Sequence, residues 1–100
     1  MAYPNGLQTI HPGEFLAEVL EELHVSQADF ARTLGVSKMQ ISHIVRGTRP
    51  LTAEMALLIG KALDQTPGYW LNLQMDYDLK SVAAAVKTKV RRIRPLHRAA

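Results

Sequence analysis

One short stretch of this 100-residue chain, from residue 37 to residue 49, carries a mixture of polar side chains with hydrogen-bonding chemistry. The stretch combines hydroxyl, amide, ammonium, imidazole and guanidinium groups with one thioether, and it contains no carboxylate. Such groups bind phosphates and the edges of nucleobases. The residues that we assign to DNA contact are Ser37, Lys38, Met39, Gln40, Ser42, His43, Arg46 and Arg49, joined by Gln27 earlier in the chain. The pattern favours a surface for double-stranded DNA.

Three of these residues are best suited to reading bases, because a helix in the major groove reaches base edges with its outward side chains. Lys38 would donate to guanine, Met39 would contact a thymine methyl, and His43 would be the third base contact. Gln40 either reads adenine or, as the third residue of its helix, caps that helix. His43 also has an alternative, as a partly buried ring bonded to backbone. The residues assigned to phosphates are Gln27, Ser42, Arg46 and Arg49, assisted by backbone N–H groups at the helix start.

Catalysis is disfavoured by what the chain lacks. It has no cysteine, its four histidines are far apart in the sequence, and no glycine-rich loop could hold a phosphate. The pairs His11 with Glu14 and His24 with Glu21 fall at predicted helix ends, where contacts with the backbone explain them. We therefore predict no enzyme activity, no cofactor and no metal site.

The element that must position the polar stretch is a helix-turn-helix between Ser26 and Gly47. Gly35 falls where the first helix must end with a positive φ, and Ala31 where the second helix crosses close to the first. Ser26 with Asp29, and Ser37 with Gln40, have the spacing of capping boxes. The apolar residues expected to point into a shared core are Phe30, Leu34, Val36, Ile41 and Ile44.

Three more helices are predicted around this unit. The first begins at Pro12 and buries one apolar face, with Glu14, Glu18, Glu21 and Glu22 on its outer side. The next is capped by Thr52 and contains Gly60, whose cost in a helix points to a close helix contact. The last begins at Thr66 and Pro67 and contains Trp70, expected in the core.

The C-terminal part has a weaker pattern. Apolar residues from Leu79 to Ile93 have helical spacing, whereas residues 86–90 alternate like an edge strand; we favour helix to about Lys89, followed by an extended or disordered basic tail. Apolar residues remain there beyond the needs of a four-helix core. The dimer surface predicted from them comprises Leu73, Tyr77, Leu79, Val82 and Val86.

Charge is segregated along the chain. Residues 1–25 carry four glutamates and no lysine or arginine, residues 26–63 have a net charge of +3, and residues 87–100 add six positive charges. This distribution suits a polyanion on one side and a different partner on the other. The six charges of the tail either contact phosphates or are a solvated end. Apolar runs are short and interrupted by charges, so we predict a cytoplasmic protein without membrane contact.

A family resemblance covers residues 10–80. It is carried by the run from Ile10 to Leu16, by the helix-turn-helix, by the segments 49–52 and 56–57, and by the blocks 70–74 (Trp-Leu-Asn-Leu-Gln) and 77–79 (Tyr-Asp-Leu). These motifs resemble the HigA-type antitoxins, which lie within the XRE or lambda-repressor-like helix-turn-helix proteins. The resemblance implies an all-α, five-helix DNA-binding domain at residues 11–80, after an N-terminal arm at 1–10 and before a C-terminal helical extension and basic tail at 81–100.

The same resemblance implies a function and a partner. The protein would neutralise a RelE-like, messenger-RNA-cleaving toxin by direct binding and repress their shared operon as a homodimer. The acidic outer face of the first helix, or the N-terminal arm before it, would help to hold the toxin, because ribonucleases that bind RNA are basic. A stand-alone phage-like or metabolic repressor without a toxin is the alternative, since it would use the same DNA-binding residues.

Overall fold

The fold is all-α over residues 10–97, the part of the chain that the computed structural model describes. Those residues contain no strand. The helices are α1 (Pro12–Leu23), α2 (Gln27–Leu34), α3 (Lys38–Val45), α4 (Ala53–Leu63), α5 (Pro67–Ala83) and α6 (Lys87–Arg92). The predicted five-helix domain with a C-terminal helical extension is therefore confirmed. Most of the N-terminal arm, residues 1–9, and residues 98–100 at the end of the tail lie outside the described part.

Helices α1 to α5 begin where the capping residues predict them to begin. Side chains of His11, Ser26, Ser37, Thr52 and Thr66 accept hydrogen bonds from backbone N–H groups in the first turns of α1 to α5. Ser37 and Gln40 form the complete, reciprocal capping box. The box predicted for α2 is only half formed, because the Asp29 carboxylate pairs with Arg32 along the helix instead.

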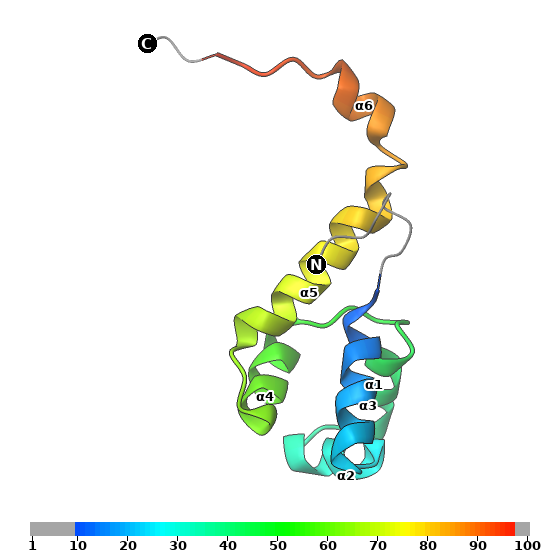
Figure 1. The fold of residues 1–100 in the computed structure, drawn as a ribbon, viewed down its shortest axis with the longest axis vertical. Coiled ribbons are helices and arrows are strands. Elements are labelled where there is room, and N and C mark those ends of the chain that lie inside the picture. The colour runs from blue at the N-terminus through cyan, green and yellow to red at the C-terminus, as the bar shows by residue number, and fades with distance from the viewer. Residues whose placement is uncertain (1–9, 98–100) are drawn as a thin grey trace.

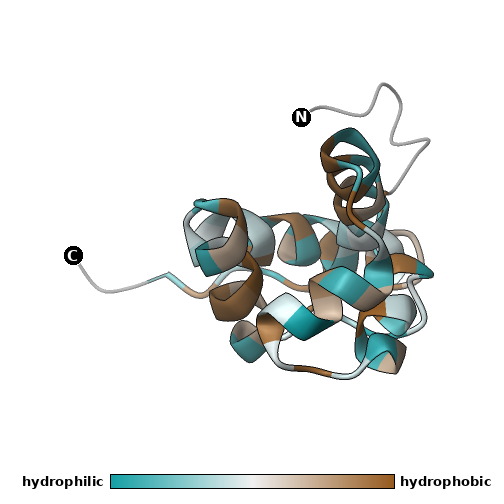
Figure 2. Cartoon of the chain, turned by 90° about the horizontal axis from the view of Figure 1, so that it is seen from below, coloured by the Kyte–Doolittle hydropathy of each residue, from teal (hydrophilic) through white to brown (hydrophobic). Residues whose placement is uncertain are grey.

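The core lies where α1 to α5 meet, and each of these helices contributes apolar residues to it. Hydrophobic and hydrophilic residues alternate along the helices (Figure 2). Leu16, Ile41, Ile59 and Trp70 are completely buried. Trp70 also donates from its indole Nε1 to the Gln65 side-chain oxygen at 2.8 Å, so its predicted place in the core is confirmed.

Two glycines mark the closest backbone approaches. A Cβ atom added to Gly13 would lie 1.8 Å from the Ile44 carbonyl oxygen, so α1 and α3 touch backbone to backbone there. One added to Gly60 would lie 2.6 Å from the Gln65 carbonyl oxygen. The helix contact predicted at Gly60 is confirmed only in part, because the approaching atoms belong to the loop between α4 and α5 and to Pro67, the first residue of α5.

The C-terminal half of α5 leaves the globule, and α6 lies beyond it, far from α2 and α3 (Figure 1). The prediction of a helix that continues to about Lys89 is only partly correct. Helix α5 ends at Ala83, and residues 84–86 form a turn before α6. The alternative of an edge strand at residues 86–90 is wrong. Within residues 10–97, no helix combines the length and the apolar character needed to cross a bilayer.

Candidate nucleic-acid interface

The turn that exposes α3 is made by two local devices. Gly35 ends α2 with φ 75°, a conformation that costs glycine least, so the predicted role of this residue is confirmed. Ser37 then caps α3 by accepting from the backbone N–H of Gln40 at 3.2 Å. Ile41 and Ile44 are buried beneath the helix, so its opposite face is left to solvent.

The outer face of α3 brings four of the predicted DNA-contacting residues together. Lys38, Met39, Ser42 and Arg46 line one hollow of the surface. Met39 is 61% exposed, which is costly for a large apolar side chain that has no partner. Such a side chain gains burial when it meets an apolar group in a groove, such as a thymine methyl.

Two glutamines near this face have different surroundings. The Gln40 side-chain oxygen accepts from the Ser37 backbone N–H at 3.2 Å, so its amide serves the capping box, one of its two predicted interpretations. That bond competes with bidentate reading of adenine. Gln27 is the first residue of α2 and is half-buried, beside backbone N–H groups that have no partner inside the helix.

His43 makes a contact that its predicted roles do not include. Its Nδ1 atom lies 2.8 Å from the Thr48 hydroxyl oxygen, and the ring is half-buried. Desolvation lowers the pKa of His43, and the guanidinium groups of Arg49 and Arg46 lower it further. The ring therefore stays neutral at neutral pH. The alternative prediction for His43 is a partly buried ring bonded to backbone. Its burial is as that alternative predicts, but its ring nitrogen contacts the Thr48 side chain and not a backbone group.

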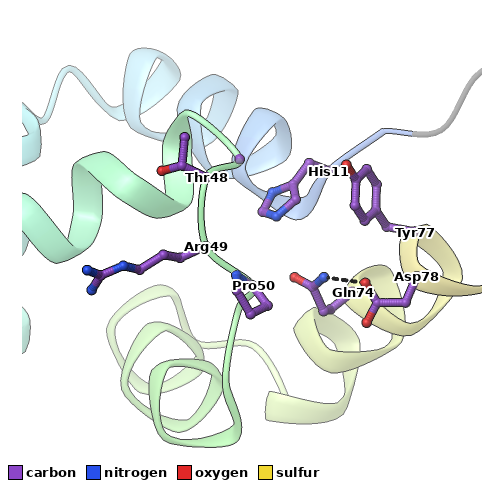
Figure 3. Close-up of a pocket in the computed structure, with 8 residues that line it drawn as sticks. His11, Thr48, Arg49, Pro50, Gln74, Tyr77 and Asp78 are labelled. Carbon is purple, nitrogen blue, oxygen red and sulfur yellow. Dashed lines mark hydrogen bonds between the residues drawn. The ribbon is translucent and has the colours of Figure 1, made fainter. Parts of the chain in front are cut away.

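Residues of α1 and α5 lie against one side of the loop from α3 to α4 (Figure 3). Gln74 of α5 accepts from the Leu51 backbone N–H at 2.7 Å in a buried contact. On the same side, His11 makes a hydrogen bond with the Arg49 backbone and packs against the Tyr77 ring, with the ring centroids 4.9 Å apart. We call these contacts of His11 and Gln74 with the loop the clamp. The Arg49 side chain is exposed and points away from it. The clamp therefore fixes the loop backbone while the Arg49 guanidinium stays available to a phosphate.

His11 is the buried residue that joins α1 to this loop. Its Nδ1 accepts from the Gly13 backbone N–H at 2.9 Å and caps α1. Burial lowers the pKa of His11, against the effects of a hydrogen bond to the Arg49 backbone and of the Asp78 and Glu14 carboxylates. His24 ends α1 in the left-handed conformation with φ 57°. Both histidines thus have the helix-end roles that the sequence predicts.

Sequence reasoning missed two residues that shape this interface, Thr48 and Gln74, and it missed the contact of His11 with the loop. Thr48 is five residues from His43 across the end of α3, a separation at which no helical pattern predicts a contact. Gln74 is polar but only 6% exposed. A buried amide must find a partner, and the available signal was its place four residues after Trp70, on the same face of the helix.

Two further surfaces, one acidic on α1 and one apolar on α5, are exposed outside α3. Glu14, Glu18, Glu21 and Glu22 are all exposed along α1. On α5, Met75, Leu79 and Val82 are 58%, 63% and 52% exposed and are spaced by four and three residues, so they form one apolar stripe.

The structure separates the residues predicted for a dimer surface. Leu79 and Val82 belong to the apolar stripe, and Val86 is half-buried in the turn after α5. Leu73 packs against the core and Tyr77 against His11, so these two have partners inside their own chain.

Comparison with known proteins agrees with this geometry. A family model described as helix-turn-helix matches residues 16–71. The transcriptional regulator YddM of Escherichia coli is 38% identical over 86 residues, which are 85% of this chain and 88% of YddM.

Solved structures are similar over almost the whole chain. An antidote protein of the HigA family from Coxiella burnetii has a TM-score of 0.85 and 36% identity, and the match covers 90% of this chain and all of that one. The Pseudomonas aeruginosa antitoxin HigA, solved with the higBA promoter, has a TM-score of 0.83 and 39% identity at the same coverage. With the exposed α3 and the turn at Gly35, these matches show that the chain belongs to the helix-turn-helix family of DNA-binding regulators, in the group that contains the HigA-type antitoxins.

Proposed function

We propose that this protein is the antitoxin of a toxin–antitoxin pair, binding an operator as a homodimer and neutralising a RelE-like, messenger-RNA-cleaving toxin. The observation that carries the proposal is the outer face of α3, where Lys38, Arg46 and the exposed Met39 share one surface with no acidic residue between Asp29 and Glu54. The similar antitoxin from Pseudomonas aeruginosa was solved with promoter DNA. Both proposed roles belong to the cytoplasm.

The dimer is required by the small size of the reading surface. One recognition helix contacts only a few base pairs, and a twofold dimer presents two of them about 34 Å apart on one face of the duplex. The apolar stripe of α5 is the surface that we assign to the partner protomer, because it is exposed and projects from the globule (Figure 1).

The toxin is assigned to the exposed glutamates of α1. They lie on an element whose other face is buried against the core, and the helix carries no lysine or arginine to offset them. A basic ribonuclease would gain favourable long-range attraction from such a surface.

The decisive experiment uses the gene's own surroundings. The protein is co-expressed with the neighbouring reading frame, and a gel shift on its own promoter is run with and without that partner. We expect a specific complex with promoter DNA, and co-purification of a small basic ribonuclease. Operator binding without any toxin partner would support a stand-alone repressor instead, and absence of both would reject the proposal.

Arg46→Ala and Lys38→Ala should weaken DNA binding in different ways. Arg46 is assigned to phosphates, so its loss should weaken binding to every duplex and reduce the slope of log K against log salt by about 1. Lys38→Ala should cost about 1–3 kcal/mol and relax the preference at one base pair. Titrations of operator and scrambled duplexes at several salt concentrations separate the two effects. Lys61→Ala, in the last turn of α4, is the matched control. If Arg46→Ala lost affinity only for the operator and not for scrambled duplexes, the assignment of Arg46 to phosphates would be contradicted.

Reversing the charge of Glu18 and Glu22 to lysine should weaken toxin binding and spare operator binding. The two side chains are exposed and one helical turn apart, so the double change alters the field of α1 without disturbing its buried face. Co-purification with the toxin and a gel shift are measured on the same preparations. Glu54→Lys, at an exposed acid on α4, controls for charge reversal away from α1, although it adds half as much positive charge as the double change. If the complex survives the double reversal unchanged, another surface holds the toxin.

A further inference from the structure

The hydrogen bonds of His43 determine where its ring hydrogen lies. The Thr48 hydroxyl oxygen is 3.2 Å from the His43 carbonyl oxygen, to which it donates, and 2.8 Å from His43 Nδ1. A threonine hydroxyl has a single hydrogen, so it cannot donate to both atoms. Both contacts are hydrogen bonds only if the hydroxyl donates to the carbonyl and accepts from an Nδ1–H group.

The other ring nitrogen is open to a ligand. Among residues 10–97, His43 Nε2 has no hydrogen-bond partner, and no buried side-chain nitrogen there is left without one, so Nε2 faces solvent. With the hydrogen on Nδ1, a neutral ring presents Nε2 as an acceptor. Partial desolvation of the ring and the charges of Arg49 and Arg46 disfavour the imidazolium form by lowering the pKa.

We propose that Thr48 sets the base preference of His43, by locking the ring so that Nε2 accepts a hydrogen bond from the exocyclic amino group of adenine or cytosine. This inference rests on the proposed operator binding by α3. In the major groove adenine N6 and cytosine N4 are donors, whereas guanine O6 and N7 and thymine O4 are acceptors. An Nε2 acceptor therefore rejects the edges that a lysine or arginine at this position would select.

Two side chains of α3 would therefore select opposite kinds of base edge. Lys38 at the start of α3 has only donors to offer and selects acceptor edges. His43, five residues later, selects a donor edge. Acidification that protonates the ring would convert Nε2 into a donor and reverse the second preference. The charged groups that act on the ring are Arg46 at the end of α3 and Arg49 in the following loop.

The first test needs no DNA. Nitrogen-15 NMR of the imidazole side chains in the free, full-length protein distinguishes the two neutral tautomers. We expect the Nδ1–H form for His43 at neutral pH in the wild type and in Thr48→Ser, which keeps the hydroxyl. Thr48→Val removes the hydroxyl at nearly the same size and should shift the population toward Nε2–H. An Nε2–H ring in the wild type would overturn the proposal.

The second test reads the operator one base pair at a time. The pair contacted by His43 is the one whose substitution loses its effect in His43→Ala, and we expect an adenine or cytosine amino group there. Exchanging that pair should weaken wild-type binding about tenfold. Thr48→Val should lose or invert the preference at this pair while keeping the preferences at the other pairs. Thr48→Ser, which keeps the hydroxyl, should show the wild-type preference. An unchanged preference in Thr48→Val rejects the locking role, whereas failure of all variants and the wild type to bind rejects the operator function itself.

Discussion

Gly13→Ala is expected to destabilise the fold by about 3 kcal/mol or more, at the upper end of the range for overpacked sites. The added methyl carbon would lie 1.8 Å from the Ile44 carbonyl oxygen and 3.0 Å from the Val45 Cα atom. Both are backbone atoms, so no side-chain rotation can relieve the overlap. The start of α1 must move away from the end of α3, which opens the core and displaces the His11 cap. Chemical denaturation followed by circular dichroism measures the loss.

Gly68→Ala is the matched control for that experiment. Gly68 lies in the first turn of α5, and nothing comes within 4 Å of a Cβ atom placed there. Because alanine favours helix and restricts the unfolded chain, this change should be neutral or slightly stabilising. Equal stability of the two variants would show that α1 and α3 do not pack as closely as described.

Local signals in the sequence predicted the helices well, because the determinants of helix ends are themselves local. A capping side chain and a positive-φ glycine act within a few residues, as Ser37 and Gly35 do. The contact at Gly13 depends instead on Ile44, 31 residues further along the chain, and no periodicity predicts it. The turn at residues 84–86 was likewise not predicted, and nothing in the structure explains why α5 ends there in a run of alanines.

The candidate interface could be predicted in its exposed residues and not in their hydrogen bonds. Helical spacing alone places Lys38 and Met39 outward once Ile41 and Ile44 are assigned to the core. The partner of His43 lies in the loop after the helix, where the chain path is set by the left-handed residue Gly47 and by the clamp from Gln74. The sequence therefore predicts which chemical group His43 presents, whereas the structure is needed to decide which ring nitrogen carries the hydrogen.

Leu79→Glu is expected to produce a monomer that binds the operator about 100-fold to 10,000-fold more weakly. Leu79 is the central residue of the apolar stripe, and a glutamate there would be buried without a partner in a twofold interface. The monomer itself should keep its stability, since Leu79 is already 63% exposed within its own chain. The loss of affinity follows from losing the second recognition helix, whose binding in the dimer is effectively intramolecular. Sedimentation at micromolar concentration and operator titration measure the two effects.

Leu57→Glu separates loss of the dimer from the general effect of a new surface charge. Leu57 is 61% exposed on α4, nearly the same as Leu79, but it lies outside the stripe. We expect this variant to remain dimeric and to bind the operator close to wild-type strength. If Leu79→Glu stays dimeric as well, the protomers meet elsewhere and the spacing of the two α3 helices must be set by another element. If it becomes monomeric yet keeps its affinity, one helix suffices for recognition and the twofold operator is rejected.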